Sequence, residues 1–223
     1  MQRLIEGYAR FRAKVYPQQA KLFEKLAKGQ QPQALFICCS DSRLMPELVM
    51  QCDPGDLFPC RNAGNLIPPA TETGSGVAAT VEYAIRVLKV ADVIVCGHSD
   101  CGAMKGILQS EDLEALPVVR SWLEHAGLSK WLTRTLKKET SMSFEERLRA
   151  ITEINVIAQM QNLKTHPAVD EALKKGTVNV HAWMYEIGSG DIRRFDPELG
   201  TFCPLLADGA AAAAETEQEL KIA

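Results

Sequence analysis

The sequence lacks three features that would each point to a class of protein. It has no apolar run near the ~18 residues that a membrane-spanning helix requires. Basic residues are not in excess, because 25 Lys and Arg stand against 28 Asp and Glu, so no nucleic-acid-binding surface is expected. A Cys-x-x-Cys pair is also absent, which argues against a thioredoxin-like redox enzyme. We therefore expect a protein that binds neither membranes nor nucleic acid.

The cysteines do not form an obvious disulfide framework. There are seven, an odd number, and two of them are adjacent. The first residues mix charged and apolar groups and lack the apolar stretch of a signal peptide. Reduced thiols and a cytoplasmic location are expected, with most cysteines acting as small buried apolar residues. Cys39 and Cys101 are exceptions because of their neighbours.

Short apolar runs alternate with helical patterns, and no linker, repeat or change of composition divides the chain. Residues 34–38 and 93–97 are continuous apolar runs, typical of strands buried on both faces of a parallel sheet. Residues 57–60 predict a weaker strand, and its proline indicates that the strand is short or lies near an edge. Residues 178–187 alternate and turn back into 192–195, which predicts a hairpin. The expected fold is α/β, with a mostly parallel central sheet, an antiparallel edge strand and flanking helices.

Helical periodicity marks the first ~30 residues, 77–90, and a long stretch over 116–163 that is interrupted near residue 140. We interpret residues 1–30 as an N-terminal helical arm within a single domain. The arm cannot bury both of its faces on one small sheet, so we expect it to pack on a second subunit. Residues 31–206 form the predicted catalytic core. Residues 207–223 are rich in Ala and Glu, and we expect a disordered tail there.

Chemistry-bearing residues follow the two strongest predicted strands at the point where each strand ends. Cys39 comes directly after the first, and His98 and Cys101 follow the second. Sites in open α/β sheets form at the carboxyl ends of strands, so these residues are candidate ligands of one zinc ion. A structural zinc site closes on four protein ligands, whereas a catalytic site keeps three and leaves a position for water.

Asp41 decides between an open and a closed site. Its carboxylate can itself be the fourth ligand, which gives a closed site. Held in a bidentate pair with Arg43, it would leave that position to water and accept the water's hydrogen bond. Zinc lowers the pKa of bound water toward ~7 and so supplies hydroxide at neutral pH. Two alternatives remain open at this point: a site closed by a fourth protein ligand that only stabilises the fold, or an ion pair that only fixes a loop.

Three spaced motifs resemble those of the β-class carbonic anhydrases, most closely the bacterial members of the plant-like subclass. They are Cys39-x-Asp41-x-Arg43, Arg61-Asn62-Ala63-Gly64-Asn65 and His98-Ser99-x-Cys101-Gly102. The resemblance implies Zn2+ on Cys39, His98 and Cys101, with Asp41 and Arg43 as the catalytic dyad. It also implies reversible hydration of carbon dioxide to bicarbonate and a proton, through attack by zinc-bound hydroxide.

The resemblance further implies a substrate pocket that a partner subunit completes. The matching positions are Gln30, Phe58 and Tyr83, with Ala63 replacing a commonly larger apolar residue and Gly102 beside the last ligand. A small apolar pocket with one amide suits a linear nonpolar substrate. At least a homodimer is implied, and a tetramer, a larger assembly or association with a carboxysome is left open. Taken alone, Phe58 and Tyr83 could equally be ordinary core residues.

One departure from the family bears on regulation. Some bacterial members carry a tryptophan three residues before the first zinc cysteine, in a bicarbonate pocket that favours the closed state. This chain has Phe36 there, although Arg61 and Tyr185 occupy the companion positions. Together with Gln30, Phe36 predicts the constitutively open subtype, in which the Asp/Arg dyad stays paired.

Other functions were weighed against carbon dioxide hydration. The same scaffold could hydrolyse carbon disulfide or carbonyl sulfide, with channel shape selecting the substrate. A non-catalytic zinc-binding or scaffold protein is a different class, but it has no need of an open coordination position. His125, His166 and His181 are candidate proton shuttles on intrinsic pKa alone, and His181 fits a structural role better.

Overall fold

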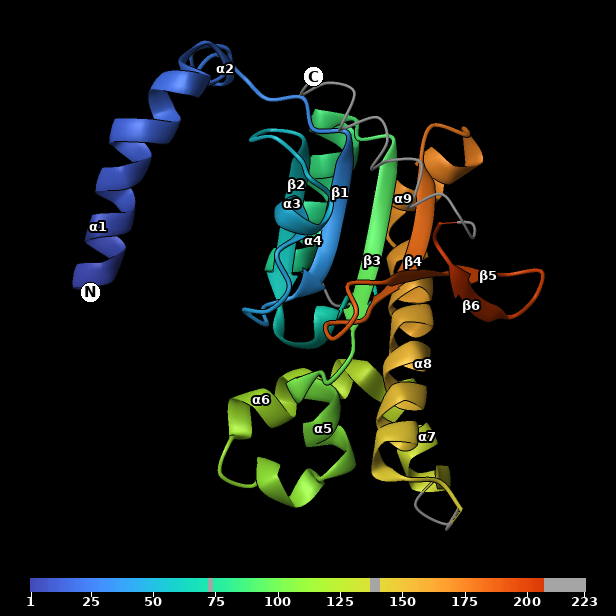
Figure 1. The fold of residues 1–223 in the computed structure, drawn as a ribbon. Helices are drawn as coiled ribbons and strands as arrows, with labels where there is room; N and C mark the ends of the chain where they lie inside the picture. Colours follow the sequence, from blue (N-terminus) through green and yellow to red (C-terminus); the bar gives the residue numbers. More distant parts are fainter. Residues whose placement is uncertain (72–73, 137–140, 207–223) are drawn as a thin grey trace.

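The computed structural model describes residues 1–71, 74–136 and 141–206, so the predicted tail over 207–223 lies outside the described residues. Six strands form one sheet in the order β2-β1-β3-β4-β5-β6 (Figure 1). They are β1 (Ala34–Cys39), β2 (Leu57–Asn62), β3 (Asp92–His98), β4 (Asn179–Tyr185), β5 (Ile192–Asp196) and β6 (Thr201–Pro204). Strands β1 to β4 run parallel, and β5 and β6 are antiparallel, which confirms the predicted fold class.

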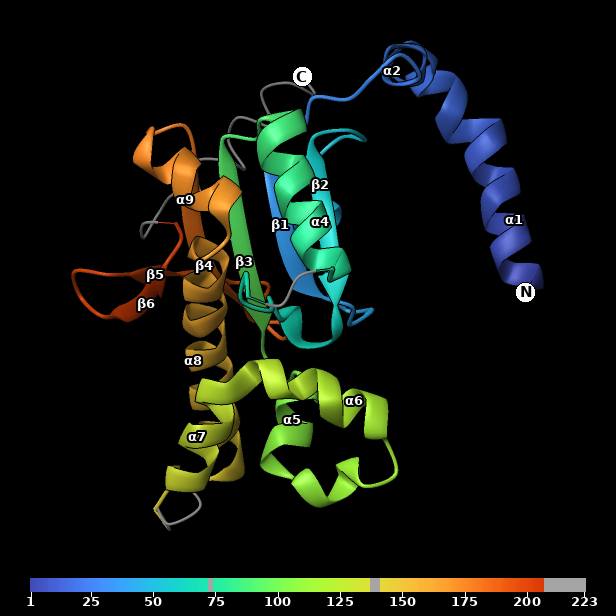
Figure 2. The ribbon, with the colours of Figure 1, turned by 180° about the vertical axis from the view of Figure 1, so that it is seen from behind.

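Helices cover one face of the sheet and one of its ends. Figure 2 shows α4 (Gly76–Tyr83), α8 (Phe144–Lys164) and α9 (Pro167–Lys174) on the rear face. The short α3 (Pro46–Val49) lies on the opposite face (Figure 1). Below the carboxyl ends of the strands lie α5 (Gly102–Leu108), α6 (Pro117–Trp122) and α7 (Gly127–Leu136). The predicted helical stretch over 116–163 is therefore broken into separate helices.

Strand β1 is the centre of the core, because all six of its residues are buried. Its side chains alternate between the two faces, as strand geometry requires. Leu35 and Ile37 pack in the cluster that includes buried residues of α4, α8 and α9. Phe36 and Cys38 pack on the other face with Leu44 of the following loop. Burial on both faces accounts for the continuous apolar run that predicted this strand.

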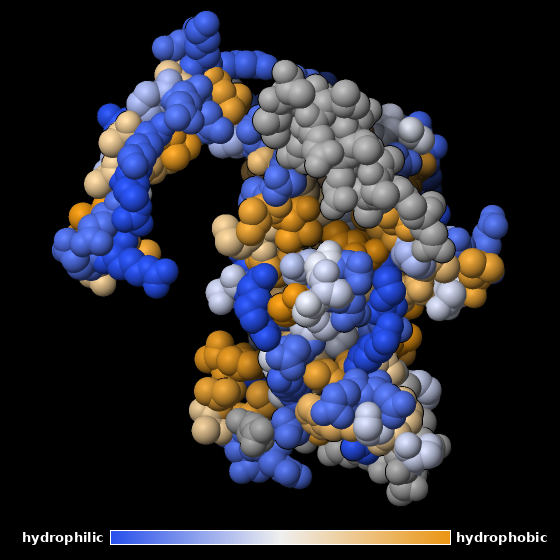
Figure 3. Space-filling view, viewed as in Figure 1, coloured by the Kyte–Doolittle hydropathy of each residue, from blue (hydrophilic) through white to orange (hydrophobic). Residues whose placement is uncertain are grey.

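The N-terminal arm stands away from the rest of the chain (Figures 1 and 2). Helix α1 (Gln2–Arg10) leads through a wide π turn and a 3-10 turn into α2 (Ala20–Leu26), and none of these residues is buried. Leu4 and Ile5 are 71% and 54% exposed. In the space-filling view of Figure 3, an open space separates the arm from a body that itself carries apolar side chains. A single chain leaves the apolar side of this arm uncovered.

No helix among the described residues is both long and apolar enough to span a bilayer. The longest, α8, is amphipathic in its packing: Ile151, Val156 and Leu163 are buried, while Arg149 and Gln161 are exposed. It begins with a capping box in which Ser143 accepts from the backbone of Glu146 and the Glu146 carboxylate accepts from Ser143.

Gly97 lets α8 lie directly against β3. A Cβ atom at this position would lie 2.4 Å from Cγ2 of Val156 and 2.9 Å from the sulfur of Met184. Only a residue without a side chain permits this approach of helix to strand. The contact matters for function because Gly97 immediately precedes His98.

We predict that Gly97→Ala lowers the free energy of unfolding by about 1–3 kcal/mol, since the added methyl must displace packed side chains. Urea denaturation of the purified protein measures the change. Gly127→Ala is the control, because a Cβ there meets no atom within 4 Å. Equal stability of the two variants would contradict the packing argument.

Candidate metal centre

Three candidate ligands meet at the carboxyl ends of β1 and β3. Cys39 ends β1, His98 ends β3, and Cys101 is the residue that precedes α5. Because β1 and β3 are adjacent and parallel, with Cys38 opposite Cys96, Cys39 and His98 lie at the same end of two neighbouring strands. One ligand atom from each of the three residues lies within 4.8 Å of the others. The strand order reverses next to β1, and such a switch point is where α/β sheets form sites.

The protonation of His98 prepares it for a metal ion. Its Nδ1 lies 2.8 Å from the carbonyl oxygen of Ser99, which can only accept, so Nδ1 carries the proton. Nε2 is then a lone-pair donor, and it is buried without a hydrogen-bond partner. A buried imidazole nitrogen left unpaired beside two cysteine sulfurs fits a metal ligand. The residues present therefore fit a bound metal.

The surroundings of Cys39 stabilise negative charge on its sulfur. The pKa of Cys39 is lowered, chiefly by the hydrogen bond from Cys101 and also by the Gly64 amide, against the effect of burial. The Gly64 N–H lies 3.4 Å from the Cys39 sulfur. The Cys101 pKa is raised, because its proton is shared with the Cys39 thiolate and the thiol is buried. The first backbone N–H groups of α5, from Ala103 and Met104, act in the opposite direction.

Asp41 is paired with Arg43 in the bidentate geometry that the open site requires. Arg43 Nε donates to Oδ1 at 2.9 Å and Nη2 donates to Oδ2 at 2.7 Å, and the Arg43 backbone N–H also donates to Oδ1. These hydrogen bonds hold the pKa of Asp41 well below its usual range. Oδ2 still lies 3.9 Å from Nε2 of His98, so the ionised carboxylate remains beside the ligands.

The loop that carries this dyad is held in place by Arg61, a residue of the neighbouring strand β2. Its guanidinium donates to the carbonyl oxygens of Cys39 at 3.2 Å, Asp41 at 2.8 Å and Leu44 at 2.7 Å. Arg61 thus fixes the conformation of the loop, a role that the motif did not indicate.

Phe36 is 1% exposed and packs edge-on against Trp183.

A ladder of buried amides on α8 supports the metal centre from behind. Asn155 Nδ2 donates to the Gly64 carbonyl at 3.0 Å, and Gln159 Oε1 accepts from the Ile67 N–H at 2.7 Å. Asn162 Nδ2 donates to the Ile67 carbonyl at 3.0 Å. Within the ladder, Gln159 Nε2 also donates to Asn155 Oδ1 at 3.1 Å. This ladder fixes the segment whose Gly64 amide reaches the Cys39 sulfur.

The predicted substrate-pocket residues divide into two groups. Phe58 and Tyr83 lie together, with ring centroids 6.0 Å apart. Phe58 is opposite Leu35, four residues before Cys39, which is roughly 13 Å along the strand at the usual rise. Gln30 precedes β1 at the same far end of the sheet. These three side chains are therefore not brought to the metal ligands of their own chain.

The remaining pocket positions lie near the ligands. Ala63 and Gly102 are both exposed, and Gly102 is the first residue of α5. The Ala63 carbonyl accepts a hydrogen bond from Nε1 of Trp122 at 2.8 Å, which joins the loop to α6. A Cβ at Gly102 would meet nothing within 4 Å. Both positions border open space in the single chain.

The other three histidines occupy structural or remote positions. His166 is buried, and its Nε2 bonds to the Pro68 carbonyl at 2.9 Å. Nε2 of His181 lies 2.7 Å from the carboxylate of Asp92. Asp92 is the first residue of β3 and His98 is the last, so this pair is at the far end of the strand from the metal centre. His125 packs its ring edge-on against Trp122. None of them contacts the candidate ligands through a bond that the structure describes.

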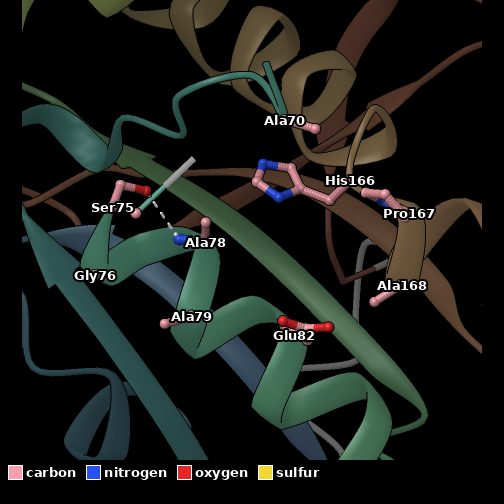
Figure 4. Close-up of a pocket in the computed structure, with 10 residues that line it drawn as sticks. Ala70, Ser75, Gly76, Ala78, Ala79, Glu82, His166, Pro167 and Ala168 are labelled. Atoms are coloured by element: carbon pink, nitrogen blue, oxygen red, sulfur yellow. Dashed lines mark hydrogen bonds between the residues drawn. The ribbon is translucent and has the colours of Figure 1, made fainter. Parts of the chain in front are cut away.

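A cleft of about 430 Å³ lies between the start of α4 and the start of α9 (Figure 4). It is lined by Ala70, Ser75, Ala79, Glu82 and His166, among others. His166, a candidate proton shuttle, lines it, whereas no predicted ligand, dyad or substrate-pocket residue does. The cleft is separate from the metal centre.

Comparison with known proteins identifies the family. The family model described as "Carbonic anhydrase" matches residues 34–192, which contain the whole centre. The chain belongs to the β-class carbonic anhydrases. A carbonic anhydrase of Pseudomonas aeruginosa is 47% identical over 205 residues, which cover 92% of each chain. The structure of the β-carbonic anhydrase CcaA superposes with a TM-score of 0.87 at 42% identity, covering 92% of this chain and 98% of that one.

A second solved structure extends the comparison to larger assemblies. One of two tetrameric β-carbonic anhydrases from the filamentous ascomycete Sordaria macrospora matches with a TM-score of 0.78 at 30% identity. The match covers 91% of this chain and 98% of that one. This carbonic anhydrase therefore shares its architecture with relatives over nearly their full length, and the family supports hydration of carbon dioxide as its reaction.

Sequence reasoning missed several residues that shape this carbonic anhydrase's site. Asn155 and Gln159 had a signal, since two amides one turn apart interrupt an apolar helical face. Gly64 and Arg61 lie within a recognised motif. No sequence pattern shows that the Gly64 N–H reaches the Cys39 sulfur or that the Arg61 guanidinium reaches backbone carbonyls, because both contacts depend on the folded geometry. Asp100 lies between two ligands and received no role, although it contacts Arg43 at 2.9 Å.

We predict that Asn155→Leu weakens metal binding by about tenfold, in line with the loss of an outer-shell partner. It also leaves the buried Gly64 carbonyl unpaired, which costs about 1–3 kcal/mol of stability. Competition with a chromophoric chelator measures affinity, and urea denaturation measures stability. Asn179→Leu removes an exposed amide and is the control. Unchanged metal affinity in the Asn155 variant would contradict the supporting role of the ladder.

Proposed function

We propose that this protein catalyses the reversible hydration of carbon dioxide to bicarbonate and a proton with zinc at the Cys39, His98 and Cys101 centre. The observation that carries the proposal is the unpaired, buried Nε2 of His98 beside two sulfurs. Two thiolates and one imidazole suit zinc, and three ligands leave one position for water. The pairing of Asp41 with Arg43 keeps the carboxylate out of that position.

Each residue then has a distinct task. Zinc, when bound, supplies the Lewis acid that makes a water molecule a nucleophile at neutral pH. Asp41 is ionised and has an oxygen beside the ligands, so it would accept a hydrogen bond from that water and orient it. Arg43 holds the carboxylate in place, and Arg61 holds the loop. The Gly64 amide stabilises charge on Cys39.

The substrate pocket belongs to an assembly of at least two chains. Gln30, Phe58 and Tyr83 lie far from their own ligands, and the arm exposes apolar side chains. A partner that covers the arm and receives these three side chains accounts for both observations. The tetrameric relatives support such an assembly.

The seven unpaired cysteines favour a reducing compartment such as the cytoplasm.

The catalytic proposal predicts that Asp41→Ala keeps its metal while its rate of carbon dioxide hydration falls about a hundredfold. One positioned proton acceptor contributes to the rate on this scale. Stopped-flow hydration assays and metal analysis of the same samples measure both. Chelation should abolish the activity of the unsubstituted enzyme, and zinc should restore it. Glu198→Ala, at an exposed turn, is the control. The proposal is wrong if the fully loaded enzyme does not hydrate carbon dioxide.

The assembly proposal predicts a mass in solution of at least twice the 24.5 kDa of one chain. Light scattering after gel filtration measures it. Leu4→Asp with Ile5→Asp should lower the mass, because charge replaces the exposed apolar side of α1. Arg3→Ala is the matched control on the same helix. A monomeric unsubstituted protein with full activity would overturn the proposal.

A further inference from the structure

Arg43 has a second carboxylate partner besides Asp41. Its Nη1 donates to Oδ2 of Asp100 at 2.9 Å, and its Nη2 donates to the Asp100 carbonyl oxygen at 3.2 Å. Together with the two side-chain bonds to Asp41, these contacts engage four of the five N–H donors of the guanidinium. Asp100 therefore holds Nη1 of Arg43, the guanidinium nitrogen that has no bond to Asp41.

The backbone of Asp100 is held in an uncommon conformation to make this contact. Its φ is +59°, in the left-handed region that disfavours residues with a side chain. Glycine would adopt this turn without strain, and Asp tolerates it better than most residues. The conformation aims both the carboxylate and the carbonyl of one residue at one guanidinium. A strained residue with two such contacts is a candidate for a functional role.

The other carboxylate oxygen of Asp100 is held by Lys105. The Lys105 ammonium forms an ion pair with Oδ1, so Asp100 lies between two cations. Lys105 is in the last turn of α5, the short helix that follows the candidate ligand Cys101. Asp41, Arg43, Asp100 and Lys105 thus form a continuous chain of alternating charge. The chain ties the dyad loop after β1 to the helix after β3.

We propose that Asp100 is a positioning residue that keeps Arg43 turned toward Asp41 and thereby keeps the fourth metal position open. The inference rests on the proposed zinc-dependent function and adds a determinant to it. Without the Asp100 carboxylate, Arg43 loses the partner of its Nη1, keeps only the contact with the residue-100 carbonyl, and releases Asp41 more readily. The freed carboxylate then competes with exogenous ligands for the metal.

The positioning role of Asp100 and its negative charge predict opposite changes in anion binding at the metal when Asp100 is replaced. Removing the negative charge of Asp100 should by itself favour binding of an anion at the metal. Release of Asp41 should instead weaken anion binding, because only the fraction of molecules with an open position can bind. The sign of the change therefore separates positioning from charge.

The test uses the full-length protein with cobalt(II) in place of zinc and titrates it with thiocyanate, following the visible absorption of the metal. Asp100→Gly removes the carboxylate without backbone strain and should weaken thiocyanate binding about fivefold, which corresponds to an open fraction of roughly one fifth. Asp100→Asn keeps an acceptor oxygen and should have a smaller effect. The control is Asp170→Asn, whose carboxylate has the same exposure and also pairs with a lysine.

A double variant shows whether Asp100 acts through Asp41. In the Asp41→Ala background, Asp100→Gly should no longer weaken thiocyanate binding, since no carboxylate remains to compete. Unchanged or tighter binding in Asp100→Gly alone would overturn the inference, as would weakening that persists without Asp41. Absence of a thiocyanate response in the unsubstituted cobalt protein would overturn it too. Failure of the zinc enzyme to hydrate carbon dioxide would instead show that the proposed function itself is wrong.

Discussion

The register of β1 against β3 is the constraint on which the metal centre depends. Cys38 lies opposite Cys96, so two adjacent parallel strands bring Cys39 and His98 to the same edge of the sheet, and a shifted register would move one ligand along the strand away from the other. Several features hold that register: burial of β1 on both faces, the close approach of α8 at Gly97, and the turn that returns Cys101 beside His98. The chemistry is thus a property of the sheet rather than of any one loop.

Much of this could be predicted because the signals are local. Continuous apolar runs predicted β1 and β3, and their ends predicted the ligands before any resemblance was considered. Pro59 correctly placed β2 at an edge. The sixth strand and the short helices α3 and α5 were not predicted, because elements of four to seven residues carry too little periodicity.

The parts that sequence could not predict are set by tertiary geometry. The amide ladder of α8 pairs Asn155 and Gln159 with backbone groups about ninety positions away, at 3.0 and 2.7 Å. The role of Asp100 depends on a left-handed turn that its residue type does not require. Motifs therefore identified the candidate ligands that the structure brings together, but not the contacts that hold each of them in place.

The uncovered arm has a consequence for how stability is measured. No residue of its helices is fully buried within its own chain, so much of the arm's order in the proposed assembly is gained on association. By mass action, dilution then lowers the stability of the arm before that of the sheet. Because Gln30 directly follows the arm, loss of its order on dilution would disturb the shared pocket while leaving the metal ligands in place. Specific activity at low protein concentration would thus fall without loss of metal.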